Sequence, residues 1–470
     1  MKRINKLAIL AALINGGIAV AADGRHAHYQ PYQDQSRVVR ASHCACGDAA
    51  CGCEDACDAE PTCDAELTCD GGCDSGCDAG SGCGGGLAAG LGFGSLMTCD
   101  IGEPWSLVQA TPLGISVGGW TNLGYHSSRN AGTGINGNGA PANFNTYDGR
   151  VQLQQQWAYA ERVADGSEGL DIGGRIDYLY GTDAPDTQTF GIANDHWDNG
   201  FDNGGAYGHS IPQVYGEVAL GNTSVKLGHF FTIVGNEVVA ATGNFFYSRQ
   251  FTFYNAEPFT HTGALATTNV GDDWTFYYGY VMGWDSGFED NGDAFLGGVK
   301  KQISDDVSLL YTTCIGRFGD RPTDANGNTP TASGARERGS IHSFILTTQL
   351  TDNLTNLIQY DYLDTNDEDG VTVRRTHGLN AYFIYQVNDC VSLGSRSEYF
   401  NWTTPQTDFE SKNLFNQTVG VNYRLHANLL VRPEVRWVYD PQRTGINELN
   451  DAGQIVSKQA TFGMDAIVTF

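Results

Sequence analysis

The sequence predicts an all-β protein, and its composition, the period of its hydrophobic pattern and the lengths of its connections all predict that class. The chain has 470 residues, with 61 glycines, 22 tyrosines and 22 phenylalanines, and only 17% are charged. Aromatic side chains favour strands and glycines favour tight turns, so this composition suits a β-rich fold. Beyond the N-terminus no stretch approaches about 18 consecutive apolar residues, which excludes a helical membrane protein.

The chain is strongly acidic. It has 54 acidic against 27 basic residues and a net charge of −27. Residues 1–43 carry +4 and residues 44–99 carry −10, which leaves −21 for residues 100–470. A nucleic-acid partner is not expected, because nucleic-acid binding needs a basic face.

Residues 1–21 have the composition of a secretory signal peptide. Three of the first six residues are basic, residues 7–20 are mostly apolar, and an A-x-A site occupies residues 19–21. The mature chain is therefore expected to be exported. We divide the rest into a polar linker at 22–43, an acidic Cys-rich low-complexity segment at 44–99 and a barrel at 105–470.

The Cys-rich segment has no base, ten acids and no C-x-x-C spacing, which argues against zinc ribbons. Its candidates for disulfides or cross-links are Cys44, Cys46, Cys51, Cys53, Cys57, Cys63, Cys69, Cys73, Cys77, Cys83 and Cys99. One interpretation is a flexible acidic linker with incidental disulfides. Another is disulfide cross-linking to other envelope proteins, since eleven cysteines cannot all pair with one another. A third is metal sequestration by thiolates, which an oxidising compartment disfavours.

From about residue 113 onward, apolar and polar residues alternate with period two, which predicts strands. Within 148–163, for example, Trp157 and Tyr159 share an apolar face opposite a row of glutamines. We expect sixteen strands at 113–125, 148–163, 168–181, 211–220, 223–231, 260–270, 273–283, 294–303, 306–316, 340–350, 353–363, 374–388, 390–401, 413–425, 428–438 and 458–470.

The connections between these strands alternate between tight turns and long loops. Residues 221–222 and 271–272 are tight, whereas 182–210 and 317–339 are long and rich in Gly, Asn and Asp. Short turns at one end and long loops at the other are typical of transmembrane antiparallel β-barrels of outer membranes. A barrel of about sixteen strands is wide enough for an aqueous channel.

The C-terminus agrees with a barrel of this kind. The last predicted strand places Phe462, Met464, Ala466 and Val468 on one face and ends at Phe470. A terminal aromatic residue on an alternating strand resembles the assembly signal of bacterial outer-membrane barrels.

With these features, residues 105–470 resemble the β-barrel porin family of the OmpL-like type. The most recognisable stretches are 225–237, 245–249 and 278–284, together with Phe470. The resemblance implies a bacterial outer-membrane location and passive diffusion of small hydrophilic solutes and ions. We expect contact with outer-membrane lipid and a homo-oligomer. We expect no enzyme activity, cofactor or metal, and no catalytic motif of diagnostic spacing occurs.

In a porin, the side chains facing the lumen carry the function. Alternation assigns thirteen residues to this pore-lining face, although each one is also open to a structural role in salt bridges between neighbouring strands. They are Gln152, Gln154, Gln156, Asp171, Arg175, Asp177, Glu217, Lys226, Arg396, Glu398, Arg432, Glu434 and Arg436.

The third long loop, 232–259, is unusually aromatic and contains Glu237, Arg249 and Glu257. We expect such a loop either to fold inward as a constriction or to pack on the rim or on a neighbouring subunit. The acidic barrel predicts a weak preference for cations, because negative charge raises the local cation concentration.

Two other function classes remain open. One is a structural envelope protein, anchored by the barrel and cross-linked through the Cys-rich segment. The other is an outer-membrane barrel enzyme, for which the sequence offers no diagnostic site. Cys314 and Cys390 fall toward opposite ends of their predicted strands, so we expect that they do not pair with each other.

Overall fold

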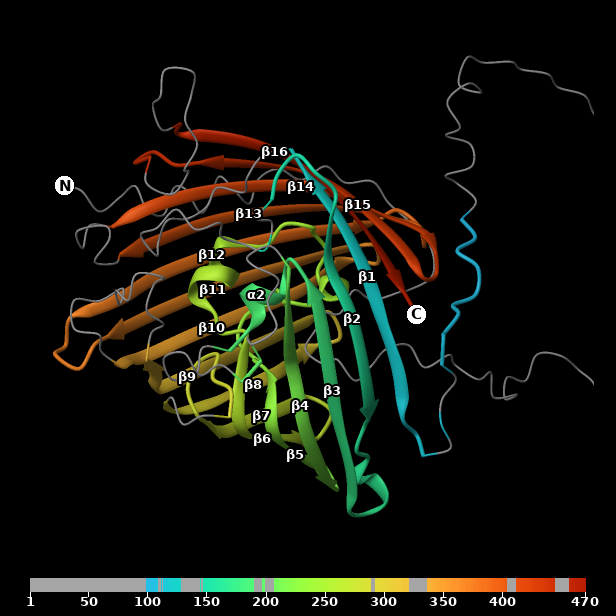
Figure 1. The fold of residues 1–470 in the computed structure, drawn as a ribbon, viewed down its shortest axis with the longest axis vertical. Helices are drawn as coiled ribbons and strands as arrows, with labels where there is room; N and C mark the ends of the chain where they lie inside the picture. The colour runs from blue at the N-terminus through green and yellow to red at the C-terminus, as the bar shows by residue number, and fades with distance from the viewer. Residues whose placement is uncertain are drawn as a thin grey trace, which may run out of the picture. The chain divides into compact units, whose positions relative to one another are not determined.

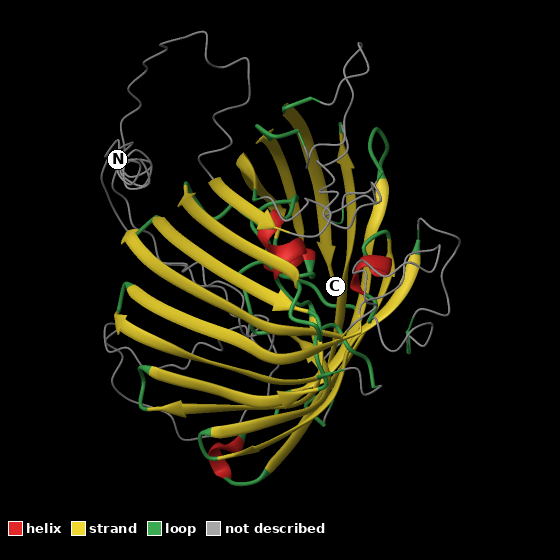
Figure 2. Ribbon diagram, turned by 90° about the vertical axis from the view of Figure 1, so that its left-hand side faces the viewer, coloured by secondary structure: helices red, strands yellow, loops and turns green. Residues whose placement is uncertain are grey.

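The computed structural model describes residues 99–108, 111, 113–127, 144, 147–189, 197–198, 207–288, 292–320, 336–403, 411–443 and 456–470. These residues form sixteen antiparallel strands that close into one barrel (Figures 1 and 2). Each strand pairs with its neighbours in sequence, and the first pairs with the last to complete the ring. The predicted fold class and strand number are confirmed.

The first eight strands are β1 (Ser116–His126), β2 (Gln152–Arg162), β3 (Asp171–Gly181), β4 (Gly208–Leu220), β5 (Thr223–Phe231), β6 (Thr260–Val270), β7 (Trp274–Val281) and β8 (Asp293–Ser304). The last eight are β9 (Val307–Asp320), β10 (Arg336–Thr351), β11 (Leu354–Asn366), β12 (Thr372–Gln386), β13 (Val391–Thr403), β14 (Lys412–His426), β15 (Leu429–Tyr439) and β16 (Lys458–Thr469).

The helical elements are short. They are η4 (Gly166–Glu168), α2 (Ala184–Thr187), η5 (Ala241–Gly243) and α3 (Phe251–Ala256). In the described part of the chain, no helix is long and apolar enough to cross a membrane.

The strand boundaries follow the alternation closely. The predicted strand at 260–270 is β6, with the same ends, and the tight turn at 221–222 joins β4 to β5. The long connections gather at the opposite end of the barrel, and parts of them lie outside the described residues.

The outward face of the barrel is apolar. On β16, Phe462 and Met464 are exposed on this face, whereas Asp465 points inward and is buried. On β7 all four outward positions are aromatic and exposed: Trp274, Phe276, Tyr278 and Tyr280. Apolar and aromatic side chains on the outside of a barrel suit lipid, which explains why so much hydrophobic surface is left uncovered.

A register shift between β1 and β2 changes the face of several side chains. Asn122 pairs with Gln155, but Leu123 pairs with Leu153, so one residue of β2 is bypassed. Beyond this bulge, Gln155 and Trp157 point inward. The pore-lining prediction for Gln156 is therefore wrong, because a one-residue slip moves every following side chain to the other face.

Trp157 and Tyr159 were expected opposite the glutamine face, and the bulge makes this expectation wrong as well. Trp157 is fully buried, and its indole Nε1 donates to Asp177 Oδ2 at 2.8 Å inside the barrel. Its ring stacks on Trp120 with centroids 4.6 Å apart.

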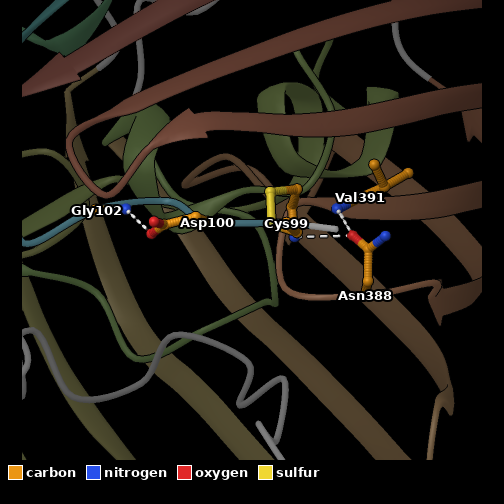
Figure 3. Close-up of a disulfide and its surroundings, with 6 residues drawn as sticks. Cys99, Asp100, Gly102, Asn388 and Val391 are labelled. Carbon is orange, nitrogen blue, oxygen red and sulfur yellow. Dashed lines mark hydrogen bonds between the residues drawn. A yellow bond between two sulfur atoms is a disulfide. The ribbon is translucent and has the colours of Figure 1, made fainter. Parts of the chain in front are cut away.

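One disulfide joins the N-terminal side of the barrel domain to a short turn. Cys99 bonds to Cys390, 291 residues away, with 5.8 Å between the Cα atoms. Figure 3 shows the bond beside Asn388, whose side-chain oxygen accepts from the backbone N–H of Cys390 and of Val391, each at 2.9 Å. Cys99 is therefore in a disulfide within the chain, which is one of the two roles that the sequence left open for it.

The other ten cysteines of the Cys-rich segment lie outside the described residues. Cys314 is buried in β9 and has no disulfide, so the prediction that it does not pair with Cys390 is confirmed.

Residues 99–105, which we call the strap, follow the disulfide along the short-turn end. Ile101 accepts from the backbone N–H of Ala427 at 2.7 Å. Trp105 exchanges two hydrogen bonds of 2.8 Å with the side chain of Asn428. Ala427 and Asn428 form the tight turn between β14 and β15. The strap thus binds two short turns before the chain enters β1.

Candidate functional site

The connection between β5 and β6, residues 232–259, lies inside the barrel, and we call it the inner loop. It leaves the wall at β5, returns to it at β6, and reaches the far side of the ring, where Arg396 of β13 donates to the Ser248 carbonyl at 2.8 Å. Gln155 of β2 donates to the Val239 carbonyl at 2.7 Å, and Glu434 of β15 accepts from Tyr247 N at 2.9 Å. Because β13 lies half-way round the ring from β5, only a segment that crosses the bore can reach it. Of the two expected dispositions, the inward one is therefore observed.

Glycines on the wall make room for the inner loop. An added Cβ at Gly394 of β13 would lie 2.1 Å from the ring of Phe245. At Gly378 of β12 it would lie 2.3 Å from Thr252 Oγ1. The missing side chains let the loop approach the sheet backbone closely.

A buried ion pair fixes the middle of the inner loop. Arg396 of β13 donates to Glu237 Oε1 at 2.5 Å and to the Ser248 carbonyl at 2.8 Å. Tyr382 of β12 also donates to Glu237 Oε1, at 2.8 Å. The side chains of Arg396 and Glu237 are 0% and 3% exposed, so the pair is shielded from water.

Two further arginines hold loop carbonyls. Arg432 Nη1 donates to the carbonyls of Ala241 and Asn244, at 2.9 and 2.5 Å. Arg436 Nη1 donates to the carbonyl of Arg249 at 3.1 Å. The two guanidinium groups thus donate to loop carbonyl oxygens that would otherwise be buried without a donor.

Carboxylates on the same wall accept from loop N–H groups. Glu398 accepts from the backbone N–H of Phe251 and Thr252, at 3.1 and 2.8 Å. Glu434 accepts from Ser248 N at 3.2 Å as well as from Tyr247 N. Alternating basic and acidic side chains therefore match the carbonyl and N–H groups of one loop.

Aromatic packing completes the inner loop. The rings of Phe253 and Phe259 stack with centroids 4.7 Å apart, and Phe144 packs on both, at 5.9 and 5.4 Å. Arg249 donates to the Val239 carbonyl at 2.9 Å and so braces the loop internally.

A carboxyl group of the inner loop, that of Glu257, meets the carboxyl group of Asp361 on the wall. Gln359 of β11 donates to Glu257 Oε1 at 2.7 Å and to Asp361 Oδ2 at 2.9 Å. Burial, followed by the neighbouring charge of Asp361, raises the pKa of Glu257 well above its ordinary value. The docked loop therefore favours a protonated Glu257.

Docking of the inner loop is expected to weaken as the pH rises above the ordinary Glu257 pKa of 4.5. Because the docked form has the higher pKa, it binds a proton that the undocked form has lost, and raising the pH removes this advantage. The docking of the loop continues to weaken until the pH reaches the raised pKa of Glu257 in the docked form. Thermal unfolding of the detergent-folded barrel across this range measures the effect.

Glu257→Gln is expected to flatten this pH dependence, since glutamine keeps the shape without a titrating proton. Glu168→Gln, which changes an exposed carboxylate in a short turn, serves as the control and should leave the slope unchanged. An equal slope in wild type and Glu257→Gln would contradict the assignment.

Apart from Gln156, the predicted pore-lining residues lie on the inward face or at its short-turn end: Gln152, Gln154, Asp171, Arg175, Asp177, Glu217, Lys226, Arg396, Glu398, Arg432, Glu434 and Arg436. The structure brings the last five together beneath the inner loop, where all are buried. Their role in lining a conducting pore stays a prediction.

The other inward residues lie elsewhere on the wall. Arg175 of β3 bonds to Asp177 at 2.6 Å and to Glu161 at 3.1 Å. Asp171 pairs with Arg162 at 2.9 Å beside a short turn. Further around the ring, Glu217 of β4 faces Lys226 of β5 across the strand pair, and both are half-buried.

Sequence reasoning missed several inward partners of the inner loop. Gln155 was hidden by the bulge. The alternation places three further partners on the inward face: Gln359, Asp361 and Tyr382. Other inward residues are of similar type, so the sequence does not distinguish these three, and only the position of the loop does. In the described part of the chain, no group of three or more His, Cys, Asp or Glu side chains is placed to hold a metal ion.

A closed sixteen-stranded barrel with an apolar outer face and a loop folded into the bore defines the class of outer-membrane porins. Within that class, the chain belongs to the family described as "Putative beta-barrel porin-2, OmpL-like", whose family model matches residues 114–470. The prediction from the sequence is confirmed. A search of curated proteins finds no match.

Solved structures with a similar fold are outer-membrane proteins. The trimer form of in-vitro folded OmpT of Vibrio cholerae has a TM-score of 0.50 at 13% identity, covering 76% of this chain and 99% of that chain. The same protein lacking its loop L8 gives the same values. An anion-selective porin from Comamonas acidovorans has a TM-score of 0.47 at 12% identity, covering 76% and 99%. Identities this low show the fold alone.

Proposed function

We propose that this porin admits small hydrophilic solutes and ions by passive diffusion through a bore that the inner loop narrows. The observation that carries the proposal is the attachment of the inner loop, which leaves the wall at β5 and β6, to the opposite wall through Arg396 of β13. Further bonds to Gln155 of β2 and Glu434 of β15 hold it along the way. A loop held this firmly sets a fixed opening. Permeation then depends on size, and the proposal needs no catalytic residue and no cofactor.

We further propose a weak preference for cations. Residues 100–470 carry a net charge of −21, and an acidic barrel concentrates cations near its mouths. The arginines beneath the inner loop do not oppose this field strongly, because Arg396 and Arg432 are paired with Glu237 and Asp465.

Proteoliposomes that contain the full mature chain test the proposal. Swelling in a series of uncharged sugars should be rapid for the smallest and fall steeply with size, because the opening is fixed. A reversal potential under a salt gradient should favour cations. No swelling with any sugar would contradict passive diffusion, and an anion-favouring reversal potential would contradict the charge argument alone.

Export through a signal peptide at residues 1–21 is part of the proposal, and a homo-oligomer is a further expectation. The structural alternative, cross-linking through the Cys-rich segment, loses one of its arguments. Because Cys99 bonds to Cys390, ten cysteines are left in that segment. An even number has no obligatory unpaired thiol.

A further inference from the structure

The two sides of the inner loop differ in chemistry. The backbone from Ala241 to Thr252 meets the charged wall formed by β13 and β15, where Arg396, Arg432 and Glu398 satisfy it. The limb at 231–239, in contrast, presents apolar side chains to the space left beside β7. The charged groups thus serve to attach the loop, and the apolar limb at 231–239 is left to line the space beside β7.

That limb borders a shallow, partly open hollow that encloses about 40 Å³. Its apolar lining comes from both limbs of the inner loop and from one inward tyrosine of β7: Phe231, Ile233, Val238, Phe253, Phe259 and Tyr277. Four of these side chains, Phe231, Ile233, Val238 and Tyr277, are only half-buried and so are open to a solute.

The hollow offers little to an ion. Glu237 is the carboxylate in its lining, and its charge is already neutralised by Arg396 and hydrogen-bonded by Tyr382. Aromatic and aliphatic side chains instead gain free energy from contact with an apolar face of a solute. The hollow is too small to enclose a whole solute but is partly open, so a solute can lay one flat apolar face against its lining.

We propose that this hollow is a binding subsite along the passage for uncharged small solutes that carry an aromatic or apolar face. The inference rests on the proposed function and deepens it, since it names a class of solute that the porin retains and passes in preference to others of similar size.

The test compares phenyl β-glucoside with methyl β-glucoside, which shares its sugar but lacks the aromatic face. Binding to the full mature chain, folded in detergent, is measured by calorimetry, and block of ion current is measured in planar bilayers. Phenyl glucoside should bind and block at least about tenfold more strongly, as expected for one well-packed aromatic contact.

Tyr277→Ala should weaken binding of phenyl glucoside by about tenfold and leave methyl glucoside unchanged. Val238→Thr replaces a methyl group by a hydroxyl of nearly equal size. It should also weaken binding of phenyl glucoside, but by less than Tyr277→Ala does. Phe276→Ala changes the outward neighbour of Tyr277 and is the matched control. Heat-modifiable mobility checks that each variant folds.

Equal binding of the two glucosides, or variants that bind as the wild type does, would overturn the subsite while leaving the porin intact. Preferential phenyl glucoside binding by a barrel that carries no current would support the hollow and overturn the proposed transport. Absence of both binding and current would overturn both.

Discussion

Replacement of Arg396 by methionine is expected to release the inner loop and enlarge the conducting path. The guanidinium bonds to Glu237, to the Ser248 carbonyl and to Ser248 Oγ, and it is fully buried. Methionine removes these bonds and leaves Glu237 without its ion pair. Breaking a buried pair by removing one partner costs roughly 3–5 kcal/mol, which weakens the attachment of the loop to β13.

Single-channel conductance and protease sensitivity of the inner loop both measure this release, and both should rise. The double variant Glu237→Gln, Arg396→Met removes the unpaired charge and should recover part of the docking. Arg162→Met breaks an exposed ion pair with Asp171, which water and salt screen, and should change neither readout. Unchanged conductance in Arg396→Met would show that other contacts hold the loop.

Cys390→Ser is expected to detach residue 99 from the barrel and to lower the resistance of the strap end to unfolding. In the chain-entropy account, closing a loop longer than about 100 residues stabilises by roughly 4–5 kcal/mol, an upper value here. The hydrogen bonds of Ile101 and Trp105 to the next turn remain, so the loss should be partial.

Unfolding of the detergent-solubilised barrel with and without reductant measures this effect. Reductant should lower the stability of the wild type, because it breaks the Cys99–Cys390 bond. It should have no effect on Cys390→Ser, which lacks that bond. Cys314→Ala is the control, because Cys314 is buried and not in a disulfide. It should lower stability through lost packing and keep the wild-type response to reductant. Equal responses in all three proteins would contradict the bond.

The strands were predictable because one face of each meets lipid. In β16, for example, Phe462 and Met464 alternate with Gly463 and Asp465, and a period of two is hard to produce by accident over a whole strand. Tight turns such as 221–222 then fixed the strand ends. Contact with lipid and the geometry of a tight turn each constrain the residue type at single positions. A single sequence therefore reveals both the strands and their ends.

The remaining features depend on contacts that the local pattern does not contain. The bulge between β1 and β2 turns Gln156 outward and Trp157 inward by shifting the register of the strand pair. The order of apolar and polar residues in the sequence does not show this shift. The inner loop was equally consistent with the rim until its partners, such as Arg396, were located. The Cys99–Cys390 bond joins residues 291 positions apart, and no spacing rule indicates it.

In the function proposed above, a fixed inner loop narrows an open, water-filled passage. Single-channel recording of the full mature chain in a planar bilayer tests it most directly. We expect discrete openings of uniform, small conductance in the wild type and larger steps in Arg396→Met. A folded, heat-modifiable barrel that never conducts, in either protein, would contradict it.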